Sequence, residues 1–435
     1  MGKKTGYCIH LVLLLIFIFS CTIETNAGNH IQIPATSAIT HHQEVWLTVF
    51  IHGTIIITPS LVAENMAPIM TDKAHKTRYG KTVIYARKNP VLYQNQAMQE
   101  EGLKKIDCTC VQPGYAAGAL AQVFETVSKE IEKKPIHNHY YTFGWSGLIS
   151  NTTRIEAANT LYYQLTQEIK HYTSKNITPK IRLIGYSHGG NVCLNLAQAA
   201  KQNNNSWHVD ELLLVATPIQ HETDYLIADP FFKRSYSFFS GSDRVQPIDF
   251  FSYKRFFSNR QFVSRADFKV PKSLTQIRLK VRKHLTNSQA INIPIEHKVS
   301  KHHRSVSPGH AEFWFFGWTP KNYRKKYPFY PLPTIALIPY IVHQIKQAHE
   351  KIVPEKPLTI TIAPAYEQMI IENNGTNTIF TTNFMTMDTL KGLKHLAMQY
   401  KPQEYNNSYY KERTTVCNKG HARHKKDRRR IVYKD

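Results

Sequence analysis

Short apolar runs alternate with longer segments of helical periodicity along the first half of the chain. Five runs rich in β-branched and aromatic residues have the pattern of buried strands: 45–54, 139–145, 180–187, 211–218 and 234–243. Three segments between them repeat apolar residues every three or four positions, as amphipathic helices do: 114–134, 154–172 and 189–202. Strands that alternate with helices form βαβ units, so this order predicts a mostly parallel central sheet with helices on both faces.

Two mixed, basic segments interrupt this pattern and are predicted to be insertions, at about 60–110 and about 250–307, with a strand expected near 277–281 in the second. The apolar segment 334–345 is short for a membrane span and contains a proline, so it predicts a buried amphipathic helix. The predicted organisation is therefore a main domain at 28–350 and a C-terminal appendage at 351–435, which consists of a strand, a helix and a basic tail expected to be disordered.

The N-terminus has the pattern of a signal peptide. Lys3 and Lys4 precede the apolar run 9–19, which is too short for a spanning helix. Small residues favour cleavage near Ala27, so residues 1–27 are predicted to be removed and the protein to be secreted or attached to the cell envelope. Cys21 offers an alternative, because the residues before it resemble a lipoprotein signal.

The chain is strongly basic, with 55 Lys and Arg against 31 Asp and Glu and a formal net charge of +24. Such a charge attracts anionic lipid surfaces, nucleic acids or other polyanions. The sequence contains no zinc-finger spacing and no RNP motif, so no specific nucleic-acid partner is expected. Part of the charge lies in the tail 421–435, where it could equally serve solubility alone.

Four cysteines lie beyond the signal segment, which is too few for a disulfide scaffold. Cys108 and Cys110 are too close to pair easily with each other, and a bridge from either one to Cys417 stays open. Cys193 is expected to be a small buried core residue.

Two serines lie between glycines, and their contexts differ. Ser187, in "GYSHGG", follows a predicted strand and precedes a predicted helix, which is the context that a nucleophile on a strained strand-to-helix turn requires. Ser146, in "GWSG", has shorter glycine spacing, and the next strong helix starts only near 153. Ser187 is therefore the predicted nucleophile, whereas Ser146 and Trp145 are predicted to line the substrate pocket.

A serine nucleophile needs a histidine base and an acid that orients it, and on such a sheet they follow in the order serine, acid, histidine. Asp243 follows the apolar strand 234–240, and His310 lies on a later Pro-Gly loop before an aromatic run. Other residues near these positions remain alternatives: Asp224, Asp229 and Asp249 for the acid, and His297, His302 and His303 for the base.

The developing oxyanion needs two backbone N–H donors. The residue after the nucleophile, His188, is predicted to supply one. The loop after the first strand is predicted to supply the other from Thr54, with Gly53 as the alternative. His52 and Tyr186 complete the predicted substrate pocket.

The histidines near His310 raise the question of a metal. Zinc sites have defined ligand spacings, and no H-E-x-x-H pattern is present. The sequence therefore predicts neither a catalytic metal nor a cofactor.

Together, "FIHGT", "TFGWSG", "IRLIGYSHGGNV", "GSDRVQP" and "PGHAEFW" resemble the motifs of bacterial α/β-hydrolases of the lipase and esterase type, over about Val45 to Trp318. The resemblance implies an α/β-hydrolase fold and hydrolysis of carboxylic esters, with lipid-like substrates, through an acyl-enzyme. An acyltransferase with the same residues and a non-catalytic binding protein of this fold are the alternatives. The aromatic and basic stretch 250–262 could lie on an anionic membrane, form a lid, or pack as a surface insertion. The sequence does not indicate an oligomeric state.

Overall fold

The computed structural model describes the residues 44–55, 71–131, 136–204, 206–246, 258–283, 306–318, 323–348, 356–373 and 378–403. All of them belong to one compact unit, Gln43–Asp435. Several sequence predictions fall outside the described residues: those for the signal segment with Cys21, Asp249, His297, His302, His303, Cys417, most of the stretch 250–262 and the basic tail.

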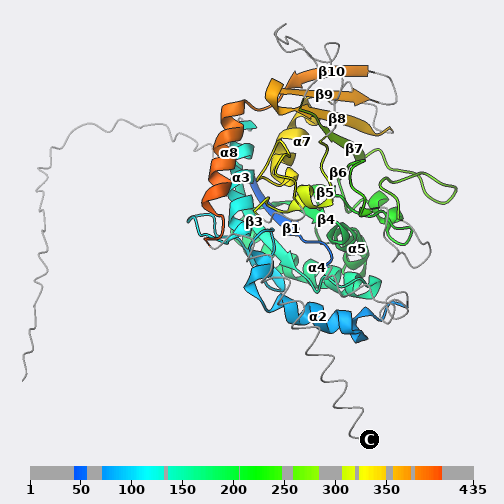
Figure 1. The fold of residues 1–435 in the computed structure, drawn as a ribbon. Helices are drawn as coiled ribbons and strands as arrows, with labels where there is room; N and C mark the ends of the chain where they lie inside the picture. The colour runs from blue at the N-terminus through cyan, green and yellow to red at the C-terminus, as the bar shows by residue number, and fades with distance from the viewer. Residues whose placement is uncertain are drawn as a thin grey trace, which may run out of the picture. The chain divides into compact units, whose positions relative to one another are not determined.

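The described residues form one ten-stranded sheet with the strand order β10-β9-β8-β7-β6-β5-β4-β1-β3-β2 (Figure 1). The strands are β1 Glu44–Ile51, β2 Gly102–Lys105, β3 Ile136–Gly144, β4 Lys180–Tyr186, β5 Glu211–Val215, β6 Ser235–Phe239, β7 Leu274–Val281, β8 Leu358–Ala363, β9 Gln368–Asn373 and β10 Thr378–Asn383. From β3 to β8 all neighbouring strands are parallel, whereas β2, β9 and β10 pair antiparallel at the two edges. The fold is thus mixed α/β with a mostly parallel sheet.

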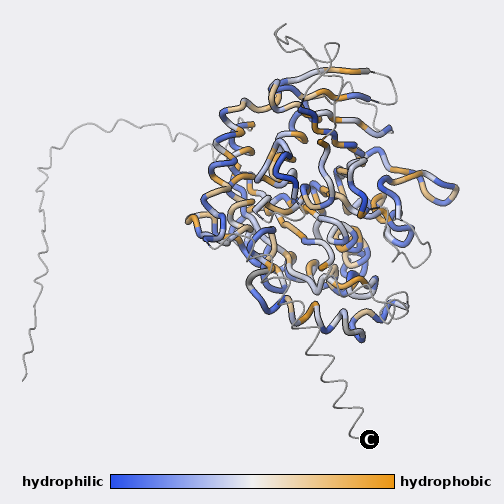
Figure 2. The backbone as a smooth tube through the Cα atoms, in the orientation of Figure 1, coloured by the Kyte–Doolittle hydropathy of each residue, from blue (hydrophilic) through white to orange (hydrophobic). Residues whose placement is uncertain are grey.

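Helices cover both faces of this sheet. They are α2 Arg78–Arg87, α3 Ala116–Ile131, α4 Asn151–Thr173, α5 His188–Gln202, α6 His310–Trp314, α7 Ile338–Gln347 and α8 Met387–Gln399. Helices α4 and α5 pack on one face, and α3, α7 and α8 pack on the other (Figure 1). Hydrophobic and hydrophilic positions alternate along these helices, as expected where each helix buries one side (Figure 2). In the described part of the chain, no helix combines the length and the hydrophobicity needed to cross a bilayer.

Strand β1 is an interior strand, between β4 and β3, and its side chains are apolar on both faces. Phe50 points to one side, where its ring meets Phe124 of α3 at a centroid distance of 5.7 Å. Val49 and Ile51 point to the other side and join the cluster of α4 and α5. Burial on both faces is the pattern of a central parallel strand.

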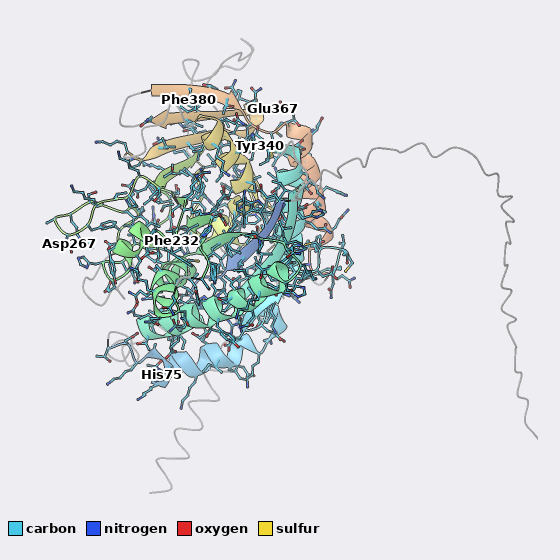
Figure 3. The ribbon with its side chains drawn as sticks, turned by 180° about the vertical axis from the view of Figure 1, so that it is seen from behind. His75, Phe232, Asp267, Tyr340, Glu367 and Phe380 are labelled. Atoms are coloured by element: carbon cyan, nitrogen blue, oxygen red, sulfur yellow. The ribbon has the colours of Figure 1, made fainter. Side chains whose placement is uncertain are left out.

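Three strands of the C-terminal segment that was predicted to form an appendage, β8, β9 and β10, belong to the main sheet. Strand β8, "LTITIA", is buried at every position and pairs parallel with β7, with Leu358 opposite Ile277. Strands β9 and β10 extend this edge, and Figure 3 places Phe380 of β10 and His75, which precedes α2, at opposite ends of the unit. A sheet covered on both faces accepts such an apolar strand regardless of its distance along the chain.

The first predicted insertion also contains regular structure. It contributes α2 and the edge strand β2, whose sequence "GLKK" lacks the apolar alternation of a strand. The predicted buried helix at 334–345 is present as a short 3-10 turn, Thr334–Leu337, followed by α7, which buries Ile338, Ile341 and Ile345.

A buried ion cluster ties the sheet to α7. The carboxylate of Glu211, at the start of β5, accepts hydrogen bonds from Arg182 Nε of β4 at 2.8 Å and from Lys346 Nζ of α7 at 2.5 Å. Burial by itself would raise the pKa of Glu211, but the two cations outweigh it and lower the pKa to about 2.

The Glu211→Gln substitution should therefore change how stability depends on pH. The folded pKa is about 2 against an ordinary value of 4.5, so this carboxylate stabilises the fold above about pH 4.5 and loses its contribution as the pH falls towards 2. Its contribution is on the order of 3 kcal/mol of unfolding free energy. Urea unfolding between pH 7 and pH 3 should show a lower free energy of unfolding at pH 7 and a shallower acid dependence in the variant than in the wild type.

The exposed Glu156 of α4 offers a matched control, since Glu156→Gln removes a carboxylate of the same kind from the surface. If the free energy of unfolding depends on pH in the same way in Glu211→Gln and Glu156→Gln, the buried cluster does not carry this effect.

Candidate functional site

Ser187 lies on the sharp turn between β4 and α5, in a strained backbone conformation. Its φ of 51° and ψ of −130° fall in a sparsely populated region for a residue with a side chain. The N–H of Ser187 donates to the carbonyl oxygen of Val215 in β5 at 2.9 Å, and the N–H of Gly190 donates to the carbonyl oxygen of Ser187 at 2.9 Å. The turn is thus anchored to the neighbouring strand and to the first turn of the helix.

Close backbone contacts explain why glycines surround this serine. A Cβ on Gly185 would lie 2.6 Å from the Cα of Gly190, so the strand and the helix approach too closely for a side chain. A Cβ on Gly189 would lie 2.5 Å from the carbonyl oxygen of Ile51. The first turn of α5 therefore packs directly on the end of β1.

The structure brings Ser187, His310 and Asp243 into one line of hydrogen bonds. His310 Nε2 lies 3.1 Å from Ser187 Oγ, and His310 Nδ1 lies 2.8 Å from Asp243 Oδ2. The three residues come from the turn after β4, the first position of α6 and the loop after β6. Ser187 is 7 % exposed and Asp243 is fully buried.

The surroundings of Asp243 keep it ionised. Burial favours the neutral acid, but the contact with His310 and the backbone N–H groups of Val245 and Gln246 outweigh it, so the pKa of Asp243 is lowered. The alternative acids are engaged elsewhere: Asp224 pairs with Arg265, and Asp229 lies 2.6 Å from Lys201 Nζ.

The backbone around His310 is held by a buried carboxylate that the sequence analysis did not single out. Glu312, which is 3 % exposed, accepts from the N–H of Gly309 at 2.8 Å and from the N–H and Nε of Arg324 at 3.0 and 2.8 Å. The bond from the Gly309 N–H to Glu312 is the glutamate half of a capping box; glycine has no side chain to form the other half, so the sequence lacks the full signature.

Tyr186, which was predicted to line the substrate pocket, contacts the segment that carries His310. Its ring is buried and stacks on Trp314 at 5.0 Å, and its hydroxyl donates to the carbonyl oxygen of His310 at 3.0 Å. The ring of Tyr186 also lies 4.9 Å from the imidazole of His310.

The loop after β1, which carries the second predicted oxyanion donor, lies against Ser187. A Cβ on Gly53 would lie only 2.7 Å from the Cβ of Ser187. The next residue, Thr54, is half-buried, and its hydroxyl has no hydrogen-bond partner within the described residues. His188 follows Ser187 as the first residue of α5, and its Nδ1 lies 3.0 Å from Nη1 of the buried Arg154.

His52 and Trp145, which were also predicted to line the substrate pocket, are buried and hydrogen-bonded around the loop after β1. His52 Nε2 lies 3.2 Å from the backbone N of Trp145 and 3.2 Å from Arg87 Nη1, while Nδ1 lies 2.7 Å from the carbonyl oxygen of Gly53. Burial and then the charge of Arg87 lower the pKa of His52 to about 3, so the ring is neutral. These contacts assign the proton to Nδ1, which donates to Gly53.

The indole Nε1 of Trp145 donates to the carbonyl oxygen of His52 at 2.7 Å, and the two rings stack at 5.7 Å. Ser146 is half-buried, and its hydroxyl lies 3.4 Å from the N–H of Leu148. Arg87 and Arg154 were not anticipated from the sequence, because an isolated arginine gives no sign that it will be buried.

The described residues include no cluster of three His, Cys, Asp or Glu side chains that could hold a metal ion. Cys193 is buried, with its Sγ 2.8 Å from the position that a Cβ on Gly185 would take. Cys108 and Cys110 have free thiols, and Cys417 lies beyond the described residues.

No protein-family model matches the chain, and a search of curated proteins finds no match. Among solved structures, the chain is similar to a "putative cell surface hydrolase" from Lactobacillus plantarum WCFS1. The match covers 86 % of this chain and 98 % of that chain, at 11 % sequence identity and a TM-score of 0.21. Similarity at this level carries no argument about function.

The close approach of Gly53 to Ser187 yields a prediction. The Gly53→Ala substitution should lower the free energy of unfolding by about 1–3 kcal/mol, because the new methyl group overlaps Ser187 and the Tyr186 ring. Urea denaturation measures this change. The control is Gly392→Ala on the exposed side of α8, where a Cβ meets nothing within 4 Å and should stabilise the helix by up to about 1 kcal/mol. Equal stability of wild type and Gly53→Ala would refute the close contact.

Proposed function

We propose that the chain is a serine hydrolase of α/β-hydrolase fold that cleaves carboxylic esters, with lipid-like esters as its substrates. The observation that carries the proposal is the hydrogen-bonded line from Asp243 through His310 to Ser187, with the serine on a strained turn. A nucleophile, a base and an acid that orients the base are the minimum set for acyl transfer through an acyl-enzyme.

The sheet topology supports the same proposal. Ser187 follows a central parallel strand and precedes a helix, Asp243 follows a later strand, and His310 comes last, all at the carboxyl edge of the sheet. This chain order is the one expected for a nucleophile elbow on such a sheet.

In the proposed acylation step, Ser187 Oγ attacks the ester carbonyl carbon as its proton passes to His310 Nε2. Asp243 stabilises the imidazolium through Nδ1 and keeps the ring in the productive orientation. Collapse of the tetrahedral intermediate breaks the carbonyl–alkoxy bond, and His310 returns the proton to the leaving alcohol. In the second step a water molecule attacks the acyl-enzyme, His310 takes its proton, and the acid and free Ser187 are released.

Negative charge on the carbonyl oxygen is stabilised by the backbone N–H groups of His188 and Thr54, with Gly53 as the alternative donor, and by the N-terminus of α5. Both predicted donors belong to segments fixed next to Ser187, since α5 packs on β1 and the Gly53 loop touches the serine. The neutral His52 contributes by holding the carbonyl of Gly53 in place.

We further propose that the enzyme acts outside the cytoplasm, at the cell envelope or as a secreted protein. This rests on the basic and apolar pattern of residues 1–27, which lie outside the described part of the chain.

The two glycine-flanked serines allow a direct test of the nucleophile. Ser187→Ala should lower hydrolysis of short and long p-nitrophenyl esters by at least about a thousandfold and abolish labelling by a fluorophosphonate probe. Ser146→Ala should remain labelled, because its hydroxyl lies outside the hydrogen-bonded line. Labelling of Ser187→Ala, or no activity and no labelling in the wild type, would refute the proposal. Faster acyl transfer to an added alcohol than to water would identify an acyltransferase with the same nucleophile.

Asp243→Asn should keep the fold but lower kcat by about 10⁴-fold, because an amide that donates to Nδ1 favours the tautomer in which Nε2 carries the proton and cannot accept it from Ser187. Steady-state hydrolysis of a soluble ester measures the effect. Asp388→Asn on the surface of α8 changes an exposed carboxylate in the same way and should retain the wild-type rate. A loss below about tenfold in Asp243→Asn would exclude Asp243 as the orienting acid.

A further inference from the structure

Helix α2 has one buried face and one exposed basic face. Tyr79, Val83 and Ala86 are buried at spacings of four and three residues. Lys81 and Ile84 of α2 and Lys88, which caps the C-terminus of the helix, are exposed at spacings of three and four, so they share the opposite side, and Ile84 is 50 % exposed. The helix therefore presents an isoleucine between two lysines to the solvent.

The buried face of α2 packs on the loops that follow β1 and β3. The Tyr79 hydroxyl lies 3.3 Å from the carbonyl oxygen of Ile55 and 3.3 Å from the N–H of Ile149. Arg87, at the end of the helix, contacts His52. Helix α2 is therefore fixed at the carboxyl ends of the parallel strands, where Ser187 also lies.

Residues 71–88 carry an excess of positive charge, and outside this segment Glu101 pairs with Nε of the buried Arg87 at 3.3 Å. Asp72 is the one acidic residue in 71–88. Its carboxylate accepts from the N–H groups of Asn151 and Thr152 at 2.7 and 2.8 Å, so its charge serves the N-terminus of α4. Four exposed lysines of this region form no ion pair within the described residues: Lys73, Lys76, Lys81 and Lys88.

We propose that the exposed face of α2, formed by Lys81, Ile84 and Lys88, docks the protein on anionic lipid bilayers. This inference rests on the lipid-like substrate of the proposed function. Lysines on the surface of a bilayer gain electrostatic energy from anionic headgroups, and an apolar side chain between them can enter the acyl boundary. A merely solvated basic face gains nothing from an exposed isoleucine at its centre.

Docking through this face has a consequence for catalysis. Since the other side of α2 touches the loops after β1 and β3, a bilayer on the exposed face would lie about one helix diameter, roughly 10 Å, from these loops at the carboxyl end of the strands. Lipid esters would then reach the nucleophile from a membrane surface instead of from dilute solution.

Vesicle sedimentation of the full chain tests the proposal. The protein carries Ser187→Ala so that no lipid is hydrolysed, and the vesicles consist of phosphatidylcholine with or without phosphatidylglycerol. The pair Lys81→Glu and Lys88→Glu should weaken binding to the anionic vesicles by at least about tenfold. Ile84→Ser should weaken it about threefold or more without any change in charge.

The matched control is the pair Lys170→Glu and Lys175→Glu, which makes the same charge change at exposed positions at the end of α4. Because α4 runs from the carboxyl edge of β3 to the start of β4, these lysines lie at the opposite sheet edge. Binding of this control should stay within about twofold of the parent. All variants should keep the parent's melting temperature within a few degrees, which separates loss of binding from loss of fold.

Equal loss of binding in both charge-reversed pairs would overturn the proposal, because net charge or the basic tail would then carry the interaction. A second result would also overturn the proposal in favour of a general polyanion site: Ile84→Ser binds the vesicles as tightly as the parent, and the pair Lys81→Glu and Lys88→Glu loses as much affinity for heparin as for the anionic vesicles. Fluorophosphonate labelling of the same variants with Ser187 restored reports on the proposed nucleophile separately. The docking proposal and the proposed function can therefore be refuted separately.

Discussion

Ser187 occupies a backbone conformation that costs about 1–3 kcal/mol for a residue with a side chain, and the surrounding structure has to supply that energy. Hydrogen bonds and close packing with the strands β1 and β5 provide this energy. The N–H of Ser187 bonds to Val215 of β5, and the first turn of α5 packs on the end of β1 without an intervening side chain. A parallel sheet with β1, β4 and β5 side by side is therefore the condition for this turn to exist.

Two histidines near this turn show how their surroundings select their roles. His52 lies in a fully buried position beside the cation Arg87, so it stays neutral and acts as a fixed hydrogen-bonding strut for Gly53. His310 lies with Nδ1 2.8 Å from the carboxylate of the ionised Asp243. One imidazole is thus held beside a cation and the other beside an anion, within the same part of the fold.

Sequence patterns predicted the parts of the molecule that depend on local periodicity. The central strands and the helices α3, α4 and α5 have strong apolar patterns. The order in which a serine, an acid and a histidine follow on such a sheet led to the prediction that Ser187, Asp243 and His310 lie together. The edge strand β2 was missed because two of its four residues are lysines and it has no apolar face. The pairing of β8 with β7 depends on distant segments meeting, which no local pattern encodes.

The buried supports of the site were missed for a related reason, and they change how the first insertion should be understood. Arg87 contacts His52 as well as Glu101, and Asp72 contacts the start of α4, so two of these contacts join the insertion to segments outside it. Deleting the insertion would leave the buried Nε2 of His52 with one donor fewer and the N-terminus of α4 without its carboxylate. Because His52 in turn holds the carbonyl of Gly53 beside Ser187, a segment that looked peripheral in the sequence is part of the structure that fixes the loop next to Ser187.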